Sequence, residues 1–387
     1  MGSKDTVIRI HDAPSTVDAR EWDDLLGTQD APTPFMRHAY LEALHASASA
    51  VPETGWAPQW ITVHEGSRLR AAAALYLKSH SYGEYVFDWA WADAYRRHGL
   101  DYYPKLLGAV PFTPVPGSRL LARDDASRAT LLQALLAYAQ KAGLSSAHLL
   151  FLSEADRAAC ERAGWMLREN VQFHWTQREG APWDSFAELL ASLQREKRKK
   201  IAQERRRVAE SGIEFDVLEG SAIDGAAWDF FHRCYTLTYR AHHSTPYLKR
   251  TFFRAMARTM PEHWLMFIAR RGSLRIAASL IALDPSRHVA YGRYWGAVEF
   301  VPCLHFEACY YQPLAWCIAN GYRRFEGGAQ GEHKMARGLM PVRTFSAHWL
   351  ADARFASAVD DFLAREGAGI AGYIDELNER NPFKPDG

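Results

Sequence analysis

The sequence predicts an α/β (α+β) fold made of two similar units, and three observations support this prediction. The chain has 387 residues, 48% of them hydrophobic, which is enough for two domains of ordinary size. Segments with strand-like alternation and segments with helical spacing of apolar residues follow one another along the chain. The second half then repeats the order of elements and several short motifs of the first half.

The first half alternates strand and helix signals up to a turn-forming linker at Glu179-Gly180-Ala181-Pro182. We therefore expect an N-terminal domain over 1–179 and a C-terminal domain over 180–387. The expected strands are 7–10, 59–63, 68–77, 84–91, 147–152 and 173–176, and the expected helices are 17–26, 37–47, 94–107, 130–141 and 154–163.

Matched motifs in the same order indicate that one α/β unit was duplicated. Two such units side by side would leave a cleft between them, which is a preferred place for ligands. The motifs are Trp60 with Gly66-Ser67 and Trp264 with Gly272-Ser273, then the aromatic segments 85–91 and 291–295, then His174-Trp175 and His348-Trp349.

Reactive side chains are concentrated in a short loop of the second half. Apolar spacing predicts a helix over 304–320, which Pro313 should kink and Asn320-Gly321 should end. A short strand over 322–326 follows. The next loop, 327–334, is rich in glycine, which lets a backbone approach a ligand closely. Its polar residues are Gln330, Glu332, His333 and Lys334.

The linker is followed by a segment that predicts one continuous basic helix over 184–211. Ser185 and Glu188 have capping-box spacing, and at 1.5 Å per residue the helix would be roughly 40 Å long. Only Glu196 and Glu204 oppose its cations, so we expect a phosphate-rich partner, which could be RNA, a nucleotide or a phospholipid headgroup. A solvated helix with ion pairs four residues apart is the alternative. The cations are Arg195, Lys197, Arg198, Lys199, Lys200, Arg205, Arg206 and Arg207.

Bulk composition excludes several classes of protein. The net charge is +1 at pH 7, so any polyanion site must be a local patch. Five cysteines without paired spacing predict reduced thiols and neither a disulfide framework nor a metal site. No signal-peptide core or membrane span is recognisable, and we expect a cytoplasmic protein.

The sequence resembles the FemAB-like N-acyltransferases of the GNAT superfamily, often labelled peptidoglycan biosynthesis or recognition proteins. The resemblance covers nearly the whole chain. It implies tandem GNAT-like domains, each with a mixed, mostly antiparallel sheet flanked by helices. It is carried by 83–89, Tyr102-Tyr103-Pro104-Lys105, 110–115, the basic segment, Leu304-His305-Phe306-Glu307, 327–334, Arg337-Gly338 and 346–349.

The resemblance implies an acyltransferase. Fem-type enzymes move an amino acid from aminoacyl-tRNA to an amine on a peptidoglycan precursor, whereas ordinary GNAT enzymes use acyl-CoA held by a glycine-rich loop. The corresponding loop here, 296–304, lacks that glycine pattern, which favours a tRNA-borne or other activated acyl group. The alternatives are an acyl-CoA enzyme acting on a small amine or lipid, and a non-catalytic module that binds RNA or a cell-wall precursor. No permanently bound cofactor is expected, because the donor is a co-substrate.

Acyl transfer to an amine needs a base, a group that stabilises the oxyanion, and a proton for the leaving group. The candidate bases are Glu326, Glu332, His333 and His305; Lys334 and Arg337 are candidate oxyanion or phosphate partners, helped by the amides of 328–331. Tyr294 or Tyr310 could protonate the leaving group. Candidate substrate-binding residues are Asp88, Trp89, Tyr102, Tyr103, Arg293, Gln330, Gly331 and Arg337. The four from the first half could form a facing wall, although aromatic packing explains them almost as well.

Overall fold

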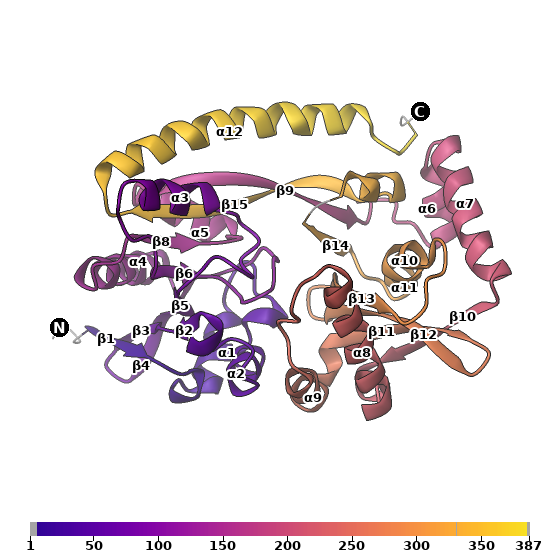
Figure 1. Cartoon of the computed structure of the whole chain (residues 1–387), viewed down its shortest axis with the longest axis horizontal. Coiled ribbons are helices and arrows are strands. Elements are labelled where there is room, and N and C mark those ends of the chain that lie inside the picture. The colour runs from indigo at the N-terminus through magenta and orange to yellow at the C-terminus, as the bar shows by residue number, and fades with distance from the viewer. Residues whose placement is uncertain (1–5, 330, 385–387) are drawn as a thin grey trace. The chain divides into compact units, whose positions relative to one another are not determined.

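The computed structural model describes residues 6–329 and 331–384, which divide into two compact units. The first unit comprises the chain up to Asn170 together with Arg343–Gly372, and the second comprises Val171–Val342 together with the chain from Tyr373 onward. These units differ from the contiguous ranges 1–179 and 180–387, because strands β9 (Met166–Thr176) and β15 (Met340–Leu350) each start in one unit and end in the other (Figure 1).

The first unit contains two groups of paired strands. One has the order β1 (Thr6–His11), β3 (Trp60–Glu65), β4 (Arg68–Ala73) and β7 (Leu121–Ala122), all antiparallel. The other has the order β15, β8 (Ser146–Leu149), β6 (Lys105–Gly108), β5 (Leu75–Lys78) and β2 (Trp56–Pro58), with only β6 and β8 parallel. The helices are α1 (Ala19–Leu26), α2 (His38–Ala46), α3 (Trp89–Arg97), α4 (Asp125–Lys141), α5 (Glu154–Arg162) and most of α12 (Ala353–Glu379).

The second unit has the strand order β10 (Ile213–Glu219), β11 (Trp264–Arg271), β12 (Leu274–Asp284), β13 (Val289–Ala297), β14 (Arg324–Ala329) and β9. Neighbouring strands are antiparallel except β13 and β14, which are parallel. The helices are α6 (Phe186–Ser192), α7 (Arg195–Glu210), α8 (Gly225–Ala241), α9 (Arg250–Thr259), α10 (Leu304–Phe306) and α11 (Gln312–Ala319).

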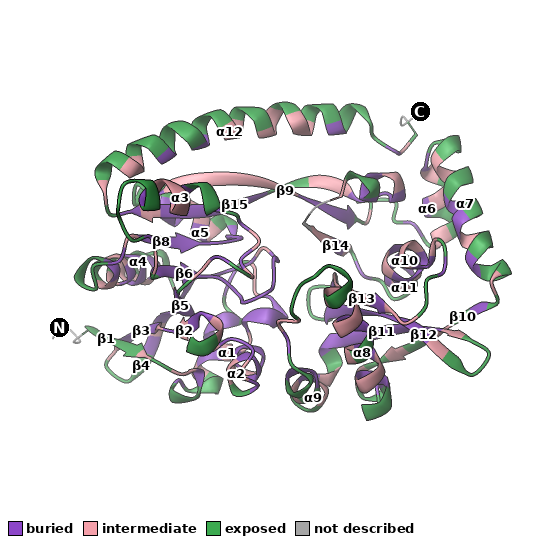
Figure 2. Ribbon diagram, in the orientation of Figure 1, coloured by how far each residue is buried: buried purple, intermediate pink, exposed green. Residues whose placement is uncertain are grey.

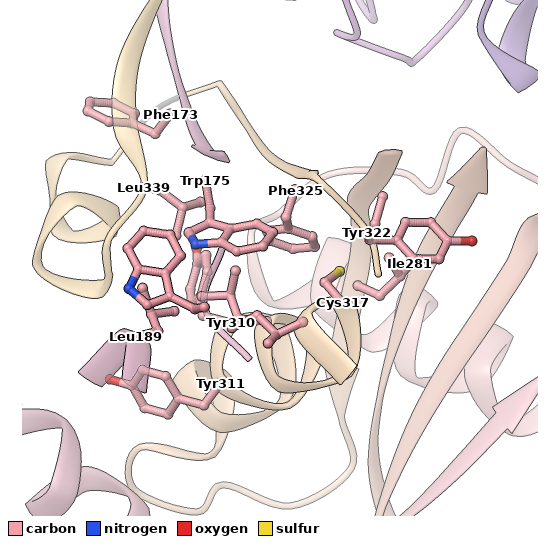
Figure 3. Packing of buried hydrophobic residues seen from close by; sticks show 14 of the residues in the cluster. Phe173, Trp175, Leu189, Ile281, Tyr310, Tyr311, Cys317, Tyr322, Phe325 and Leu339 are labelled. Carbon is pink, nitrogen blue, oxygen red and sulfur yellow. The ribbon is translucent and has the colours of Figure 1, made fainter. Parts of the chain in front are cut away.

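These strands and helices confirm the predicted α/β class with mostly antiparallel sheets. The hairpins predicted around Gly66 and Gly272 are confirmed as β3–β4 and β11–β12. The middle strands of the second unit are buried and α7 is largely exposed (Figure 2). Side chains from β9, β14 and the segment before α11 pack into one aromatic core, which contains Trp175, Tyr310 and Phe325 (Figure 3).

The predicted aromatic strand over 84–91 is wrong. Residues 84–88 form a loop and Trp89 begins α3; Tyr85 has a positive φ of 64°, which interrupts the extended backbone of a regular strand. The predicted helix over 94–107 likewise ends at Arg97, and its last residues belong to β6. The aromatic-strand match between the two halves therefore holds only for β13.

The single basic helix predicted over 184–211 is also wrong, because it is broken into α6 and α7. Ser185 does cap α6, where its Oγ accepts a hydrogen bond from the Glu188 amide at 3.2 Å. Leu193 and Gln194 between the helices have extended backbones and pair with the C-terminal segment, as the Gln194 amide donates to the Pro382 carbonyl at 2.8 Å. The charge pattern gave no sign of this pairing.

The predicted helix over 304–320 contains one turn of π-helix, Glu307–Tyr311, between α10 and α11. The amide of Gln312 donates to the carbonyl of Glu307, five residues earlier. In the same pattern the carbonyl of Ala308 would accept a hydrogen bond from the amide of Pro313, but proline has no amide hydrogen. The hydroxyl of Ser279 donates to that carbonyl instead, at 2.6 Å. π-Turns inside helices occur frequently at functional sites.

Candidate functional site

A pocket of about 130 Å³ lies where β13 and β14 separate in the second unit. The two strands pair only from Val289–Tyr291 to Arg324–Glu326. On the other side of β13, Leu280 pairs with Tyr294 and Ile281 with Gly292, so Arg293 is the extra residue of a β-bulge. A bulge leaves its extra residue outside the regular ladder and re-aims the strand. Its place beside the pocket makes the backbone of Arg293 a candidate hydrogen-bond donor to a ligand.

Glycine is required at Gly327, which lines this pocket. A Cβ atom there would lie 2.5 Å from Leu339 Cδ2 and 2.9 Å from the carbonyl oxygen of Phe173. The contact with the Phe173 carbonyl could be relieved only by moving β9, so glycine is needed here for close packing on β9. The close approach of the loop glycines to a ligand stays a prediction. The same hypothetical atom lies 3.4 Å from Lys334 Cδ, which places the lysine stem next to the pocket.

Lys334 is buried with only 4% of its surface exposed, and it lies in the 3-10 segment Glu332–Arg337 that follows β14. Its Nζ donates to the carbonyl of Gly328 at 3.2 Å. Burial lowers the pKa of Lys334 to about 8, with Cys309 opposing the shift. At pH 7 the side chain is therefore mainly a desolvated cation, and such a cation stabilises a developing negative charge more strongly than one in water.

His305 and Tyr310 line the pocket from the α10 and π-helical side. Burial lowers the pKa of His305 to about 4, so its ring is neutral at pH 7 and can accept a hydrogen bond or a proton. Burial raises the pKa of Tyr310 far above its ordinary value, so its phenol stays protonated. The Tyr310 hydroxyl lies 3.4 Å from Nε2 of His333, whose ring is exposed to solvent and whose pKa is lowered by partial burial.

Tyr294 and Arg293 also line the pocket, where Arg293 Nη2 donates to the Tyr294 hydroxyl at 3.0 Å. Cys309 lines it as well, and burial raises the pKa of its thiol. Cys309 and Trp295 were not among the residues predicted for the site. Cys309 could have been found from Pro313, because a proline disturbs the backbone hydrogen bond of the residue four positions before it in a helix.

Glu326 lies on the opposite face of β14 from the pocket. Side chains alternate along a strand, and Phe325 and Gly327 are the ones that line the pocket. Burial raises the pKa of Glu326 to about 7, although the Arg324 and Arg293 cations oppose this. Nε2 of His174, whose pKa burial lowers to about 3, lies 3.9 Å from Glu326 Oε2.

Other residues of the predicted loop point elsewhere. Glu332 is exposed, accepts a hydrogen bond from Tyr373 at 2.9 Å and pairs with Arg380 at 3.3 Å. Gly331 has φ 104°, and a Cβ atom there would lie 2.4 Å from the His333 ring. Gln330 lies outside the described residues.

Arg337 is buried and its charge is matched within the protein. Its Nη2 lies 3.0 Å from Glu204, its guanidinium sits 3.6 Å from the centre of the Phe306 ring, and its Nη1 donates to the His333 carbonyl at 2.6 Å. Glu204 also accepts a hydrogen bond from Tyr311. Arg337 therefore positions the loop around His333, and its role as an oxyanion or phosphate partner stays a prediction.

Three of the four candidates from the first half, Asp88, Tyr102 and Tyr103, come together in the first unit around Lys105, which is fully buried. Its Nζ donates to Glu84 at 2.8 Å and to Asp88, and Tyr102 donates to Asp88 at 2.7 Å. Burial raises the pKa of Glu84 to about 7, whereas for Asp88 the Lys105 ammonium overcomes burial and holds the pKa well below its ordinary value.

Two residues of this first-unit cluster were missed as candidates although they stand in quoted motifs, namely Glu84 and Lys105. Tyr103 bonds to Ser81 at 2.8 Å and belongs to the cluster. Trp89 is 40% exposed and packs on Tyr82 with ring centres 5.0 Å apart. That these residues form a wall facing the second-unit pocket stays a prediction.

Helix α7 presents an excess of cations to solvent. Helical spacing allows an ion pair between Lys200 and Glu204, which are four residues apart. The buried Glu204 instead faces Arg337 and Tyr311, and among the described residues no ion pair joins it to Lys200. Arg205 pairs with Glu307 at 3.3 Å and Arg206 with Glu210 at 3.7 Å. The exposed cations are Arg195, Lys199, Lys200, Arg206 and Arg207, and the half-buried ones are Lys197, Arg198 and Arg205.

Comparison with known structures supports this description of the fold. The structure matches L-PGS from Bacillus licheniformis (TM-score 0.56, 10% identity, 91% of this chain and 97% of that chain). It also matches a C-terminal domain from Agrobacterium fabrum assigned to lysylphosphatidylglycerol synthetase (TM-score 0.54, 10% identity, 91% and 97%) and FemX (TM-score 0.52, 11% identity, 89% and 98%). No curated protein matches the sequence.

In the part of the chain that the structure describes, no helix is long and apolar enough to cross a membrane. A family model described as FemAB-like, peptidoglycan biosynthesis/recognition, matches residues 13–385. That range includes both units, the pocket between β13 and β14, and the basic helix α7. The chain therefore belongs to the FemAB-like family of peptidoglycan biosynthesis and recognition proteins.

Proposed function

We propose that this protein is an acyltransferase that moves an acyl or aminoacyl group from an activated donor to an amine. The observation that carries this proposal is the pocket beside the bulge at Arg293, which is lined by a neutral imidazole and a protonated phenol and has a desolvated lysine packed next to it. These three groups match the three needs of acyl transfer to an amine. Membership in the FemAB-like family and the similarity in fold to FemX are consistent with it.

Each group has a defined part in the proposed reaction. The amine nitrogen forms a bond to the acyl carbonyl carbon and gives its proton to His305, whose pKa of about 4 keeps the ring unprotonated. The carbonyl oxygen becomes an oxyanion, which the Lys334 ammonium and the bulge amide of Arg293 stabilise. The bond from carbon to the leaving oxygen then breaks, and Tyr310 supplies the proton that this oxygen needs.

The proposed donor is aminoacyl-tRNA. The exposed cations of α7 provide phosphate contacts on the second unit, which also holds the pocket. An acyl-CoA donor would need an anion site at the loop between β13 and α10. That loop carries Glu299 in an ion pair with Arg271 at 2.7 Å, and this geometry is unsuited to a diphosphate.

The donor can be identified by following two labels. Purified protein is incubated with an amine-bearing peptidoglycan precursor and either bulk aminoacyl-tRNA labelled in the amino acid or labelled acetyl-CoA. We expect label to move to the amine from tRNA and not from acetyl-CoA. Transfer from acetyl-CoA alone would replace the proposed donor with acyl-CoA, and transfer from neither would favour a non-catalytic binding module.

A further inference from the structure

A larger, mainly apolar groove of about 600 Å³ lies beside the candidate site in the second unit. Its walls are Leu237 and Ala241 of α8, Trp295 and Ala297 of β13, and Phe300 and Val301 of the following loop. We call these residues the apolar groove. Trp295 and His305 line both this groove and the smaller pocket, so the two meet at that pair of rings, whose centres lie 5.5 Å apart.

Close packing of α8 on β13 fixes the shape of the apolar groove. A Cβ atom on Gly296 would lie 2.1 Å from the carbonyl oxygen of Cys234, so only glycine lets the helix lie this close to the strand. The hydroxyl of Thr238 donates to the carbonyl of Trp295 at 2.9 Å and ties the two elements together. Val301 is buried in the neighbouring core, and the groove is therefore a formed feature of the unit.

The chemistry of the lining selects an apolar ligand. Among the described residues, no lysine or arginine lines the groove, and the acid that does, Glu299, is paired with Arg271. Phosphate groups would find no cation there, whereas an aliphatic chain would remove several partly exposed apolar side chains from water. Phe300, with 88% of its surface exposed, is the largest of these exposures in the groove.

We propose that the apolar groove binds the aliphatic chain of a substrate whose reactive end lies in the pocket lined by Tyr310. This proposal rests on the proposed acyl transfer for the identity of that reactive end. Because the proposed donor, aminoacyl-tRNA, carries no long aliphatic chain, the chain in the groove belongs to a lipid-like amine acceptor.

Binding can be measured without turnover by isothermal titration with laurate, octanoate and dodecylamine, all below their micelle-forming concentrations. The variants are Ala241→Trp and Phe300→Asp, which fill the groove or place a charge in it. Ala226→Trp is the matched control, because Ala226 is exposed in the first turn of the same helix and does not line the groove.

We expect laurate or dodecylamine to bind, with affinity rising about fourfold for each added methylene. Both groove variants should weaken binding at least tenfold, and Ala226→Trp should not. Binding of dodecylamine supports an amine-bearing acceptor, whereas binding of laurate without binding of dodecylamine would overturn the assignment of the chain to the acceptor.

The proposal is overturned if neither probe binds, or if both groove variants bind them as the wild type does. Lys334→Ala should bind dodecylamine no more weakly than the wild type even where it fails to transfer an acyl group. Failure of the groove and failure of the proposed reaction are therefore distinguishable.

Discussion

At the scale of single residues, the sequence showed which reactive side chains were present but not which way they point. His305 and Tyr294 were predicted for the site and do line the pocket, and Lys334 packs next to it. Glu332 was an equally good candidate by composition, yet it is exposed and bonded to Tyr373. Glu332 follows Gly331, whose φ is 104°, and residue type alone does not predict the direction that the chain takes there.

Glu326 offers a test of burial at this scale. Burial raises its pKa from 4.5 to about 7. Between pH 4.5 and about pH 7, the carboxyl group is therefore protonated in the folded state and ionised in the unfolded state. The stabilisation from that proton is fully present below pH 4.5 and is lost as the pH rises through about 7.

We expect Glu326→Gln, which mimics the neutral acid, to gain stability relative to the wild type as the pH rises. The gain between about pH 4 and pH 8 should approach roughly 3 kcal/mol, because each pH unit between the folded and unfolded pKa values contributes about 1.36 kcal/mol. Urea unfolding at both pH values measures it, with Glu179→Gln as the exposed control. A difference between Glu326→Gln and wild type that does not change with pH would mean that Glu326 is ionised in the folded protein.

At the scale of elements, the sequence predicted strands and hairpins best where burial alternation and turns agreed. Strands β3–β4 and β11–β12 are of this kind. It failed at the break between α6 and α7, because the partner of Leu193 and Gln194 is a segment nearly two hundred residues away in the chain. It also failed for 84–91, where Glu84 and Asp88 turn inward to Lys105 and override the strand propensity of the aromatic residues.

Helix α7 is the element on which the tRNA proposal can be tested. Lys199 and Arg206 are both exposed and lie two turns apart on one side of the helix. We expect Lys199→Glu with Arg206→Glu to weaken tRNA binding and to lower the slope of log K against log salt by roughly 1 to 2, since each lost phosphate contact removes about 0.7 to 0.9.

The matched control for this experiment is Arg240→Glu with Arg258→Glu, which changes the charge of the same unit equally at exposed sites outside α7. Filter binding of labelled tRNA across a series of salt concentrations gives the slope. Equal effects of the two pairs would show that only the net charge matters, and would remove α7 as the tRNA site.

At the scale of the whole molecule, duplicated motifs predicted two α/β units, and the chain does divide into two units with related hairpins. The duplicated motifs did not predict that the chain returns to the first unit at Arg343. Strands β9 and β15 each continue from one unit into the other, and their sequences do not mark the place where one unit ends. The two units also differ in chemistry. The first buries a lysine between two carboxylates, and the second has a pocket lined by a histidine and tyrosines.

We infer that the second-unit pocket performs acyl transfer with Lys334 as its cation. The most direct test is the single-turnover rate of label transfer to the amine by wild type, Lys334→Ala and Lys334→Arg over a range of pH. Dividing the wild-type rate by the Lys334→Arg rate removes the titration of the amine itself, because arginine stays charged throughout.

We expect Lys334→Ala to transfer at least a hundredfold more slowly than the wild type, because it lacks an oxyanion donor. The ratio of the wild-type rate to the Lys334→Arg rate should be constant at low pH and should fall about tenfold per pH unit above a pH of about 8, where Lys334 loses its proton. A Lys334→Ala variant as fast as the wild type, or a ratio that stays flat through pH 8, would show that Lys334 is not the cation of this reaction.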